Sequence, residues 1–414
     1  MEHGSYFLYA LLWIIGWGVV GAVVTPRIYR RKDLDVSQAS LAGAAAGAAG
    51  GPFTLILLWY LTPKLDWKWV VIPGVVIAAI LIAAFAVADP DNLCVTRGDF
   101  VATQIVNGIV IGTIYGLMAL GLTLIFSILG VVSFAHGEFY MLGGMVVYYL
   151  TNVWFPGLSP IVGVLAAALV TFVIGAVFER LLLRAMNTGQ VERPGEYAIL
   201  VTFALAFLLQ YLTLAIVGAD PKKVPRFIDY PVINLPSAEN PSLLKTTVAN
   251  IRLFDFISIS STRFTAAVIA LILLGLLMWF LYRTWIGKAL RAVSQDRHAA
   301  AVTGINPNTM NTLAFGMGTM LAGLSGASLV QVFSWVPWVG TTASSRAFVV
   351  IVLGGMGSLP GAFIGGLIVG VVEALGAGCV PDPQRAAAYI PAYGMAILTL
   401  VLLLKPTGLF GREL

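Results

Sequence analysis

Charged side chains are scarce in this sequence. Asp, Glu, Lys and Arg make up 10% of the 414 residues, whereas soluble globular domains contain about 25%. Hydrophobic residues account for 59%, and the mean hydropathy is +0.92. This composition excludes a soluble domain and predicts a polytopic membrane protein.

Cysteine is rarer still, with two residues, Cys94 and Cys379. Both lie in short connecting segments, where we expect reduced, unpaired thiols and no disulfide. The first ten residues contain no Lys or Arg, so we do not expect a cleaved secretory signal. The net charge of +5 is spread over the segments between apolar runs, as in the positive-inside rule, and no nucleic-acid partner is expected.

A phosphate-binding loop is also missing. The pattern Gly-x-x-x-x-Gly-Lys-Ser/Thr does not occur, because Gly287-Lys288 is followed by Ala289 and lacks the upstream glycine. The chain therefore cannot cradle ATP in such a loop, and any energy for transport must come from elsewhere.

Long apolar runs, in contrast, are abundant. A run of about 20 residues can cross about 30 Å of hydrocarbon as a helix. Such runs lie near residues 6–24, 41–61, 69–88, 105–128, 138–155, 160–178, 196–218, 263–282, 309–333, 361–378 and 387–404. The shorter run 346–353 predicts a half-helix or a tilted piece. The expected fold is an all-α, multi-helix transmembrane bundle with discontinuous helices.

Basic residues between the runs predict the orientation. The connections 179–193, 283–297 and 405–412 carry clustered Arg and Lys residues and are expected in the cytoplasm, together with the C-terminus. The polar loop 219–262 then lies outside, where a partner can reach it.

Residues 1–99 are predicted to form an N-terminal extension with two or three extra transmembrane helices, ahead of a core of residues 100–414. The basic stretch 27–32 predicts a cytoplasmic first loop, but the rest of the orientation places 89–104 outside. These two placements require an odd number of membrane crossings between the first loop and residues 89–104. The sequence offers two candidate spans there, 41–61 and 69–88, so the two placements conflict. Either the Ala- and Gly-rich stretch 41–52 does not span, or the first loop departs from the charge rule.

The stretch 130–138, Gly-Val-Val-Ser-Phe-Ala-His-Gly-Glu, interrupts an apolar region with two ionisable residues, His136 and Glu138. A charged side chain near the bilayer centre costs at least about 2.5 kcal/mol, so such residues indicate a functional site. Backbone freed by a break must line a cavity or pack against protein. A structural interpretation stays open: His136 would hydrogen-bond a freed carbonyl, and Glu138 would cap the next helix.

A second interruption, Gly354 to Gly361, follows a similar helix later in the chain and indicates a weak internal pseudo-repeat. Paired breaks of this kind are typical of transporter binding sites. Glycines also recur at four-residue spacing, which favours close helix packing inside one subunit: Gly108, Gly112 and Gly116, then Gly361 and Gly365, then Gly366 and Gly370.

The segment 287–306 predicts an amphipathic helix rich in small residues that ends at Gly304. A short exposed helix of this kind suits docking into a groove on another protein. A solvated connecting helix without a partner is the alternative. Its polar residues are Lys288, Arg291, Asp296 and Arg297.

Several motifs together resemble the permease subunit of branched-chain amino acid ABC importers. The resemblance covers about residues 100–412, in the family's order. Residues 1–99 have no support from it, and Arg346 stands where the family more often shows Lys. The motifs are Asn107-Gly108 to Gly112, Tyr115 to Leu124, Phe134-Ala-His-Gly-Glu138, Tyr140 to Gly143, Gly287 to Asn306, Ala347 to Gly361, Glu373-Ala-Leu375 and Lys405-Pro-Thr-Gly-Leu-Phe-Gly411.

The resemblance implies a permease in the plasma (inner) membrane that forms half of a pore for branched-chain or related amino acids. It pairs with a second, related permease, in a homo- or heterodimer, with two ATP-binding subunits and with an external solute-binding protein. ATP and magnesium would be used by those partners, and this chain would bind no cofactor and no metal. The implied path residues are Phe134, His136, Gly137, Glu138, Gly354, Gly355, Gly357 and Ser358. The implied coupling residues are Lys288, Arg291, Asp296, Arg297, Ala299, Ala300 and Gly304.

Three alternatives compete with this interpretation. An ion-driven secondary transporter would use His136, Glu138 and Glu373 as a proton relay, but it needs no coupling helix. A membrane enzyme would use His136 and Glu138 as an acid and base, yet side chains at i and i+2 do not meet on a helix. A related importer for urea or short amides would share every motif.

Overall fold

The computed structural model describes residues 18–22, 25–26, 43–44, 94, 97–187, 191–228, 234–235, 244–246, 250–253, 257–379, 386–405 and 407–411. The chain divides into two compact units. One comprises residues 1–98, 379–383 and 403–406, and the other comprises residues 99–378, 384–402 and 407–414. The runs predicted at 6–24, 41–61 and 69–88, with the question of their topology, fall almost entirely outside the described residues.

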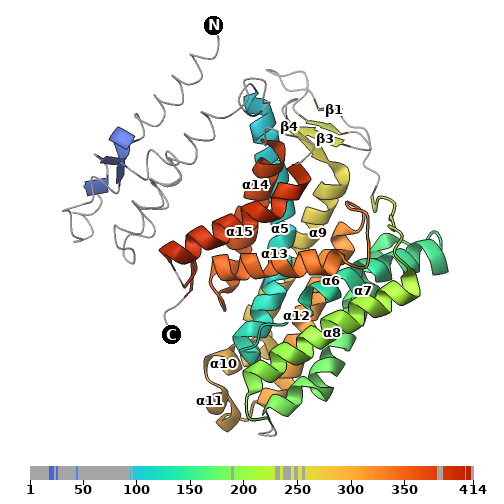
Figure 1. Cartoon of the computed structure of the whole chain (residues 1–414), viewed down its shortest axis with the longest axis vertical. Helices are drawn as coiled ribbons and strands as arrows, with labels where there is room; N and C mark the ends of the chain where they lie inside the picture. Colours follow the sequence, from blue (N-terminus) through green and yellow to red (C-terminus); the bar gives the residue numbers. More distant parts are fainter. Residues whose placement is uncertain are drawn as a thin grey trace. The chain divides into compact units, whose positions relative to one another are not determined.

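Helices dominate the second unit (Figure 1). They are α5 (Gly98–Leu129), α6 (His136–Tyr148) with a π-helical end η1 (Tyr149–Trp154), α7 (Pro160–Leu181) with the 3-10 turn η2 (Leu183–Asn187), α8 (Pro194–Val217), α9 (Ser261–Arg283), α10 (Trp285–Gln295), α11 (Arg297–Val302), α12 (Pro307–Leu329), α13 (Val339–Gly354), α14 (Leu359–Gly378) and α15 (Ala386–Leu404). Within the described residues, α5, α7, α8, α9, α12 and α14 are long and apolar enough to cross a membrane. The predicted all-α polytopic class is confirmed.

Proline sets several helix starts. Pro160, Pro194 and Pro307 each open a helix, where the missing N–H costs nothing and the fixed φ suits the first turn. Asn306 adds a side-chain cap to α12, accepting from the backbone N–H of Asn308 at 3.0 Å.

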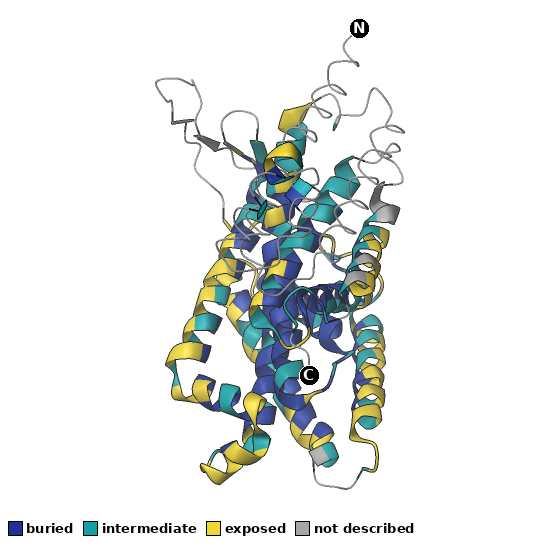
Figure 2. Ribbon diagram, turned by 90° about the vertical axis from the view of Figure 1, so that its left-hand side faces the viewer, coloured by how far each residue is buried: buried dark blue, intermediate teal, exposed yellow. Residues whose placement is uncertain are grey.

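The core lies along α5 and α12, which are buried over most of their length (Figure 2). Small residues allow this: a side chain at Gly121 would collide with Gly318 on α12, and one at Gly323 would collide with Thr171 on α7. The glycines of α5 pack in the same way on α14, with Gly112 against Leu367. The predicted tight packing inside one subunit is therefore confirmed.

A four-stranded antiparallel sheet occupies one end of this unit, and α10 and α11 occupy the other (Figure 1). Its strands, in order, are β1 (Asn234–Leu235), β2 (Leu244–Thr246), β3 (Asn250–Leu253) and β4 (Ile257–Ser260). The sequence interpretation expected only a polar loop here. The alternation Ile-Ser-Ile-Ser in β4 was the available signal, since it buries Ile259 against the apolar side chains Val110 and Ala267.

The prediction of two unpaired thiols is wrong, because Cys94 and Cys379 form a disulfide across 285 residues. Cys379 directly follows α14, and Cys94 lies four residues before α5. The end of α14 packs beside the start of α5, with Gly378 against the Gln104 side chain. The pairing depends on this long-range helix packing, which the segment lengths did not reveal.

Thiol labelling tests this disulfide directly. We expect a maleimide-coupled polymer to leave the denatured, unreduced protein unmodified and to add two labels after reduction, because the described chain has no free cysteine. Cys379→Ser should expose one reactive thiol without reduction. Two labels on the unreduced wild-type protein would contradict the pairing.

Candidate functional site

The break between α5 and α6 begins at Gly130. Its N–H still donates to Phe126 O at 2.9 Å, but its φ of +69° turns the chain out of the helix. Left-handed backbone of this kind favours glycine. The chain resumes as α6 at His136, so the predicted discontinuity lies where the sequence placed it.

Gly137 is the point of closest approach between α6 and α13. A side chain at this position would collide with Gly340 O and with Ser344. The Gly137 N–H donates to Ser344 Oγ at 2.9 Å, and Ser344 Oγ in turn donates to Phe134 O at 3.3 Å. The start of α13 therefore holds the break in place.

His136 is fully buried and bonds to α5. Its Nε2 lies 2.9 Å from Met118 O, and since a carbonyl only accepts, Nε2 carries the proton. The carbonyl belongs to the middle of α5 and not to the break, which differs from the structural interpretation of the sequence. Nδ1 has no hydrogen-bond partner among the described residues.

Glu138 is 2% exposed and lies against the first turn of α13. Its carboxylate fills the space that a side chain at Gly340 would need. The expected cap of its own helix is absent, because the first N–H groups of α6 donate to Ser133 O, Ala135 O and Ser344 Oγ. Glu138 Oε2 also has no partner in the described part of the chain.

An aromatic row, missed from the sequence, runs from the break along α8. Phe134 lies 5.0 Å from Phe348 and 6.0 Å from Phe203, measured between ring centroids. Phe203, Phe207 and Tyr211 then follow at four-residue spacing, with centroids 4.8 and 6.2 Å apart. This spacing places them on one helix face and was the available signal.

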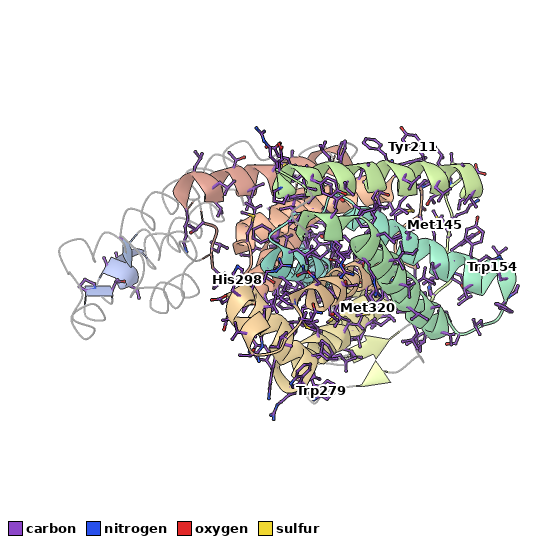
Figure 3. All side chains as sticks on the ribbon, turned by 90° about the horizontal axis from the view of Figure 1, so that it is seen from below. Met145, Trp154, Tyr211, Trp279, His298 and Met320 are labelled. Atoms are coloured by element: carbon purple, nitrogen blue, oxygen red, sulfur yellow. A yellow bond between two sulfur atoms is a disulfide. The ribbon has the colours of Figure 1, made fainter. Side chains whose placement is uncertain are left out.

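Figure 3 shows the outer end of this row. Tyr211 lies at the periphery of the bundle, as do Trp154 and Trp279, when the molecule is viewed from the end that carries α10 and α11. The row therefore connects a buried break with the outer surface of α8.

The second break is not close to the first. Gly340 and Gly354 lie at opposite ends of α13, about 21 Å apart at 1.5 Å per residue. Gly355 and Gly357 have φ values of +99° and +84°, and Ser358 Oγ accepts from Gly361 N at 3.2 Å. The chain end pairs with this turn, since Phe410 N donates to Gly354 O at 3.0 Å.

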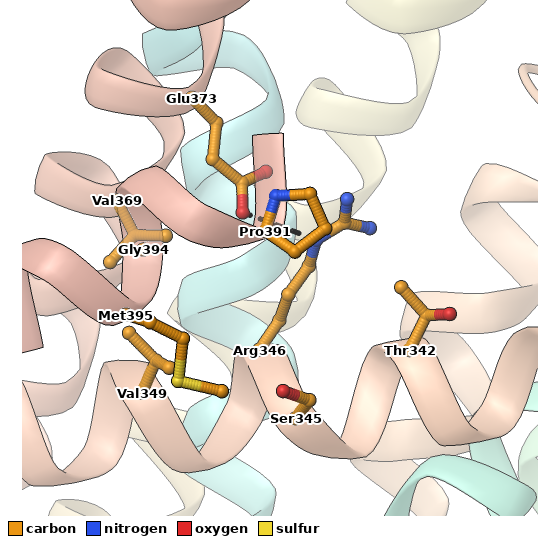
Figure 4. Close-up of a pocket in the computed structure, with 9 residues that line it drawn as sticks. All are labelled: Thr342, Ser345, Arg346, Val349, Val369, Glu373, Pro391, Gly394 and Met395. Atoms are coloured by element: carbon orange, nitrogen blue, oxygen red, sulfur yellow. Dashed lines mark hydrogen bonds and ion pairs between the residues drawn. The ribbon is translucent and has the colours of Figure 1, made fainter. Parts of the chain in front are cut away.

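Charged residues meet at a third place, between α5, α13 and α14. Arg346 Nε donates to Glu373 Oε1 at 3.2 Å, and the Tyr115 hydroxyl donates to Glu373 Oε2 at 3.1 Å. The Arg346 guanidinium also lies 5.3 Å from the centre of the Tyr115 ring. A pocket opens beside this group (Figure 4).

The segment 287–306 forms two helices, α10 and α11, and not the one expected. Asp296 separates them and caps α11, accepting from His298 N at 2.8 Å and from Ala299 N at 3.0 Å. These backbone N–H groups, Ala299 first, hold the pKa of the exposed Asp296 carboxyl below its usual value.

The predicted coupling residues divide between an inner and an outer face of α10 and α11. Arg291 bonds to Leu281 O at 3.1 Å and stacks on Tyr282, and Ala300 is buried, so both face their own chain. Val302, which the sequence interpretation missed, is 89% exposed. Lys288, Asp296, Ala299 and Gly304 are exposed, and Arg297 is half-buried.

Comparisons with known proteins agree with this architecture. The family described as branched-chain amino acid transport system, permease component, matches residues 104–405. The permease protein BraD of the high-affinity branched-chain amino acid transport system of Pseudomonas aeruginosa is 31% identical over 75% of this chain and 95% of its own length. LivH of Escherichia coli is 29% identical over the same shares. The probable LivH of Methanocaldococcus jannaschii is 25% identical over 72% of this chain and 88% of its own length. No solved structure matches.

Proposed function

Since the chain belongs to the family of branched-chain amino acid transport permease components, we propose that it forms half of a translocation path that follows the α5–α6 break. The chain is the multi-pass membrane permease of an ABC transporter. We assign its solute as a branched-chain amino acid, delivered by an external solute-binding protein.

Unpaired polar atoms at the break carry this proposal. Among the described residues, four buried side-chain atoms lack a hydrogen-bond partner, and three of them lie within six residues: Ser133 Oγ, His136 Nδ1 and Glu138 Oε2. Buried polar groups are normally paired, so such a group of exceptions needs an explanation. Water or solute entering along the path would supply the missing partners.

The aromatic row supplies an apolar side to the same path. Phe134 and Phe348 pack directly over the break, and α8 extends the row to the surface. Aromatic faces suit an aliphatic side chain, which gains from leaving water but needs no hydrogen bond. The roles of Gly354, Gly355, Gly357 and Ser358 in the path stay a prediction.

The two ends of the bundle fit different partners. We assign α10 and α11, which include most of the basic connection 283–297, to the cytoplasm, where two ATP-binding subunits would dock. The sheet end would then face the solute-binding protein, the C-terminus would be cytoplasmic, and the membrane would be the plasma (inner) membrane. A second permease completes the pore, and ATP and magnesium stay with the ATP-binding subunits.

Solute uptake tests this function. The permease, co-expressed with the ATP-binding, second permease and solute-binding proteins of its transporter, is expected to drive ATP-dependent uptake of leucine, isoleucine and valine into vesicles. Urea and acetamide are the controls, because related importers could carry them. Uptake of these two without any uptake of the amino acids would contradict the proposed solute.

A further inference from the structure

Glu179 is a buried carboxylate in the last turn of α7, at the end of the unit that carries α10 and α11. The residue is 1% exposed, and burying a carboxylate is costly unless opposite charges or hydrogen bonds compensate it. Three arginines supply opposite charge, namely Arg184 in η2, Arg297 at the start of α11 and the neighbouring Arg180. The carboxylate therefore lies where α7 meets α11.

The same carboxylate is bonded to α12. The Thr312 hydroxyl, in the second turn of α12, donates to Glu179 Oε2. Only residues 303–306 separate α11 from α12, and this connection is closed by a bond from Ile305 N to Ala300 O of 3.1 Å. A displacement of α11 therefore reaches the base of α12 directly.

α12 leads from this base to the break between α5 and α6. It has 23 residues, so it is about 35 Å long, and it runs into the middle of the bundle (Figure 1). A side chain at Gly318 would collide with Gly121 O of α5, and one at Gly326 would collide with Tyr140 O of α6. Backbones in such close contact transmit displacement, because a packed interior has little free space.

We propose that Glu179 is a positioning residue for energy coupling. By fixing the base of α12 to α7, it makes these two helices respond as one unit when the ATP-binding subunits displace α11. Glu179 touches neither the solute nor those subunits, since it is buried within its own chain. This inference rests on the proposed function and adds a residue that acts between the docking surface and the path.

The energetics of buried charge favour this role over a purely stabilising one. Exchanging a buried ion pair for well-packed apolar side chains is often neutral or stabilising, so burial of Glu179 is weak evidence for stability. A carboxylate can, however, accept bonds from several directions at once. Here it accepts from α12 while positive charges of η2 and α11 lie around it.

Solute transport and ATP hydrolysis, measured in the same vesicles, test the role. The complete transporter, with its solute-binding protein, is compared at equal amounts of assembled complex. Thr312→Val removes the hydroxyl and keeps the shape of the side chain. We expect the leucine transported per ATP hydrolysed to fall about fivefold or more, as for the loss of a hydrogen bond to a charged group. Basal hydrolysis without the solute-binding protein should equal the wild type.

Two further variants show whether the bond itself is responsible. Thr312→Ser restores the hydroxyl and should restore the wild-type ratio of transport to hydrolysis. Glu179→Ala should lower the ratio at least as far as Thr312→Val, and combining the two should cause no further loss, because both remove the same bond. If Glu179→Ala does not assemble, the two Thr312 variants decide the matter.

Glu196→Gln is the matched control. Glu196 is an exposed carboxylate at the start of α8, paired with Arg193. It lies at the same end of the bundle, since the adjacent Tyr197 hydroxyl donates to Leu182 O at 3.1 Å. Its neutralisation should leave the ratio of transport to hydrolysis unchanged.

The outcomes separate this role from the proposed function. A wild-type ratio in assembled Thr312→Val overturns the role and leaves the function intact, as does an equal loss in Thr312→Ser or in Glu196→Gln. A parallel fall of basal hydrolysis also overturns it, because the variant would then act on the docking of the ATP-binding subunits. If the wild-type transporter takes up no branched-chain amino acid, the proposed function itself is wrong.

Discussion

Replacing Gly137 with leucine is expected to abolish solute uptake while the transporter still assembles. The new side chain would meet Gly340 O and Ser344, and inserting bulk into a packed contact costs about 1–3 kcal/mol. α6 and α13 would have to separate, which breaks the bond from Gly137 N to Ser344 Oγ. Uptake in vesicles measures the loss, and co-purification with the ATP-binding subunits measures assembly.

Two companion variants show whether the contact or the bulk matters. Gly275→Leu adds the same side chain to α9 in open space and should transport at the wild-type rate. Ser344→Ala removes the hydroxyl that bonds to Gly137 and Phe134 without adding bulk, and it should reduce uptake only in part. Normal uptake by assembled Gly137→Leu would show that the break lies away from the path.

Changing Val302 to aspartate is expected to remove most transport and most of the ATP hydrolysis stimulated by the solute-binding protein. Val302 is 89% exposed, so the permease itself loses almost no packing. An exposed apolar side chain on a short helix suits burial in an interface, where fully burying a Val side chain contributes about 1.5–3 kcal/mol. A carboxylate buried there would oppose docking.

Val302→Ile is the matched control, since it keeps the apolar surface and should preserve both activities. Ala300, although part of the predicted coupling set, is buried against its own chain, so Ala300→Leu should reduce protein stability and yield. Wild-type stimulated hydrolysis by Val302→Asp would place the docking surface elsewhere.

Local features of the fold were readable from the sequence. The break at Gly130 follows from the backbone freedom of glycine, and the close packing of α5 on α14 follows from its missing side chain. Both are properties of the single residue, so the sequence reveals them. The half-helix expected at 346–353 was too short, because α13 begins at Val339. Its first turns, Gly-Thr-Thr-Ala-Ser-Ser, are small and polar, and hydrophobicity alone did not mark them.

Features that depend on contacts between residues far apart in the chain could not be predicted from the sequence. The bond from His136 to Met118 O requires α6 to lie beside the middle of α5, and the aromatic row requires α8 to pass Phe134. The Arg346–Glu373 pair joins α13 and α14, and the relative register of two helices cannot be predicted from one sequence. The helix start at Asp296 could have been found, since Asp is one of the preferred N-cap residues and three alanines follow within five positions.

The Cys94–Cys379 bond also orders the assembly of the chain in time. Its two ends are 285 residues apart, so ribosomal synthesis delivers Cys379 long after Cys94. The bond cannot close until every helix from α5 to α14 has been made. It therefore places no constraint on those helices while they are being synthesised.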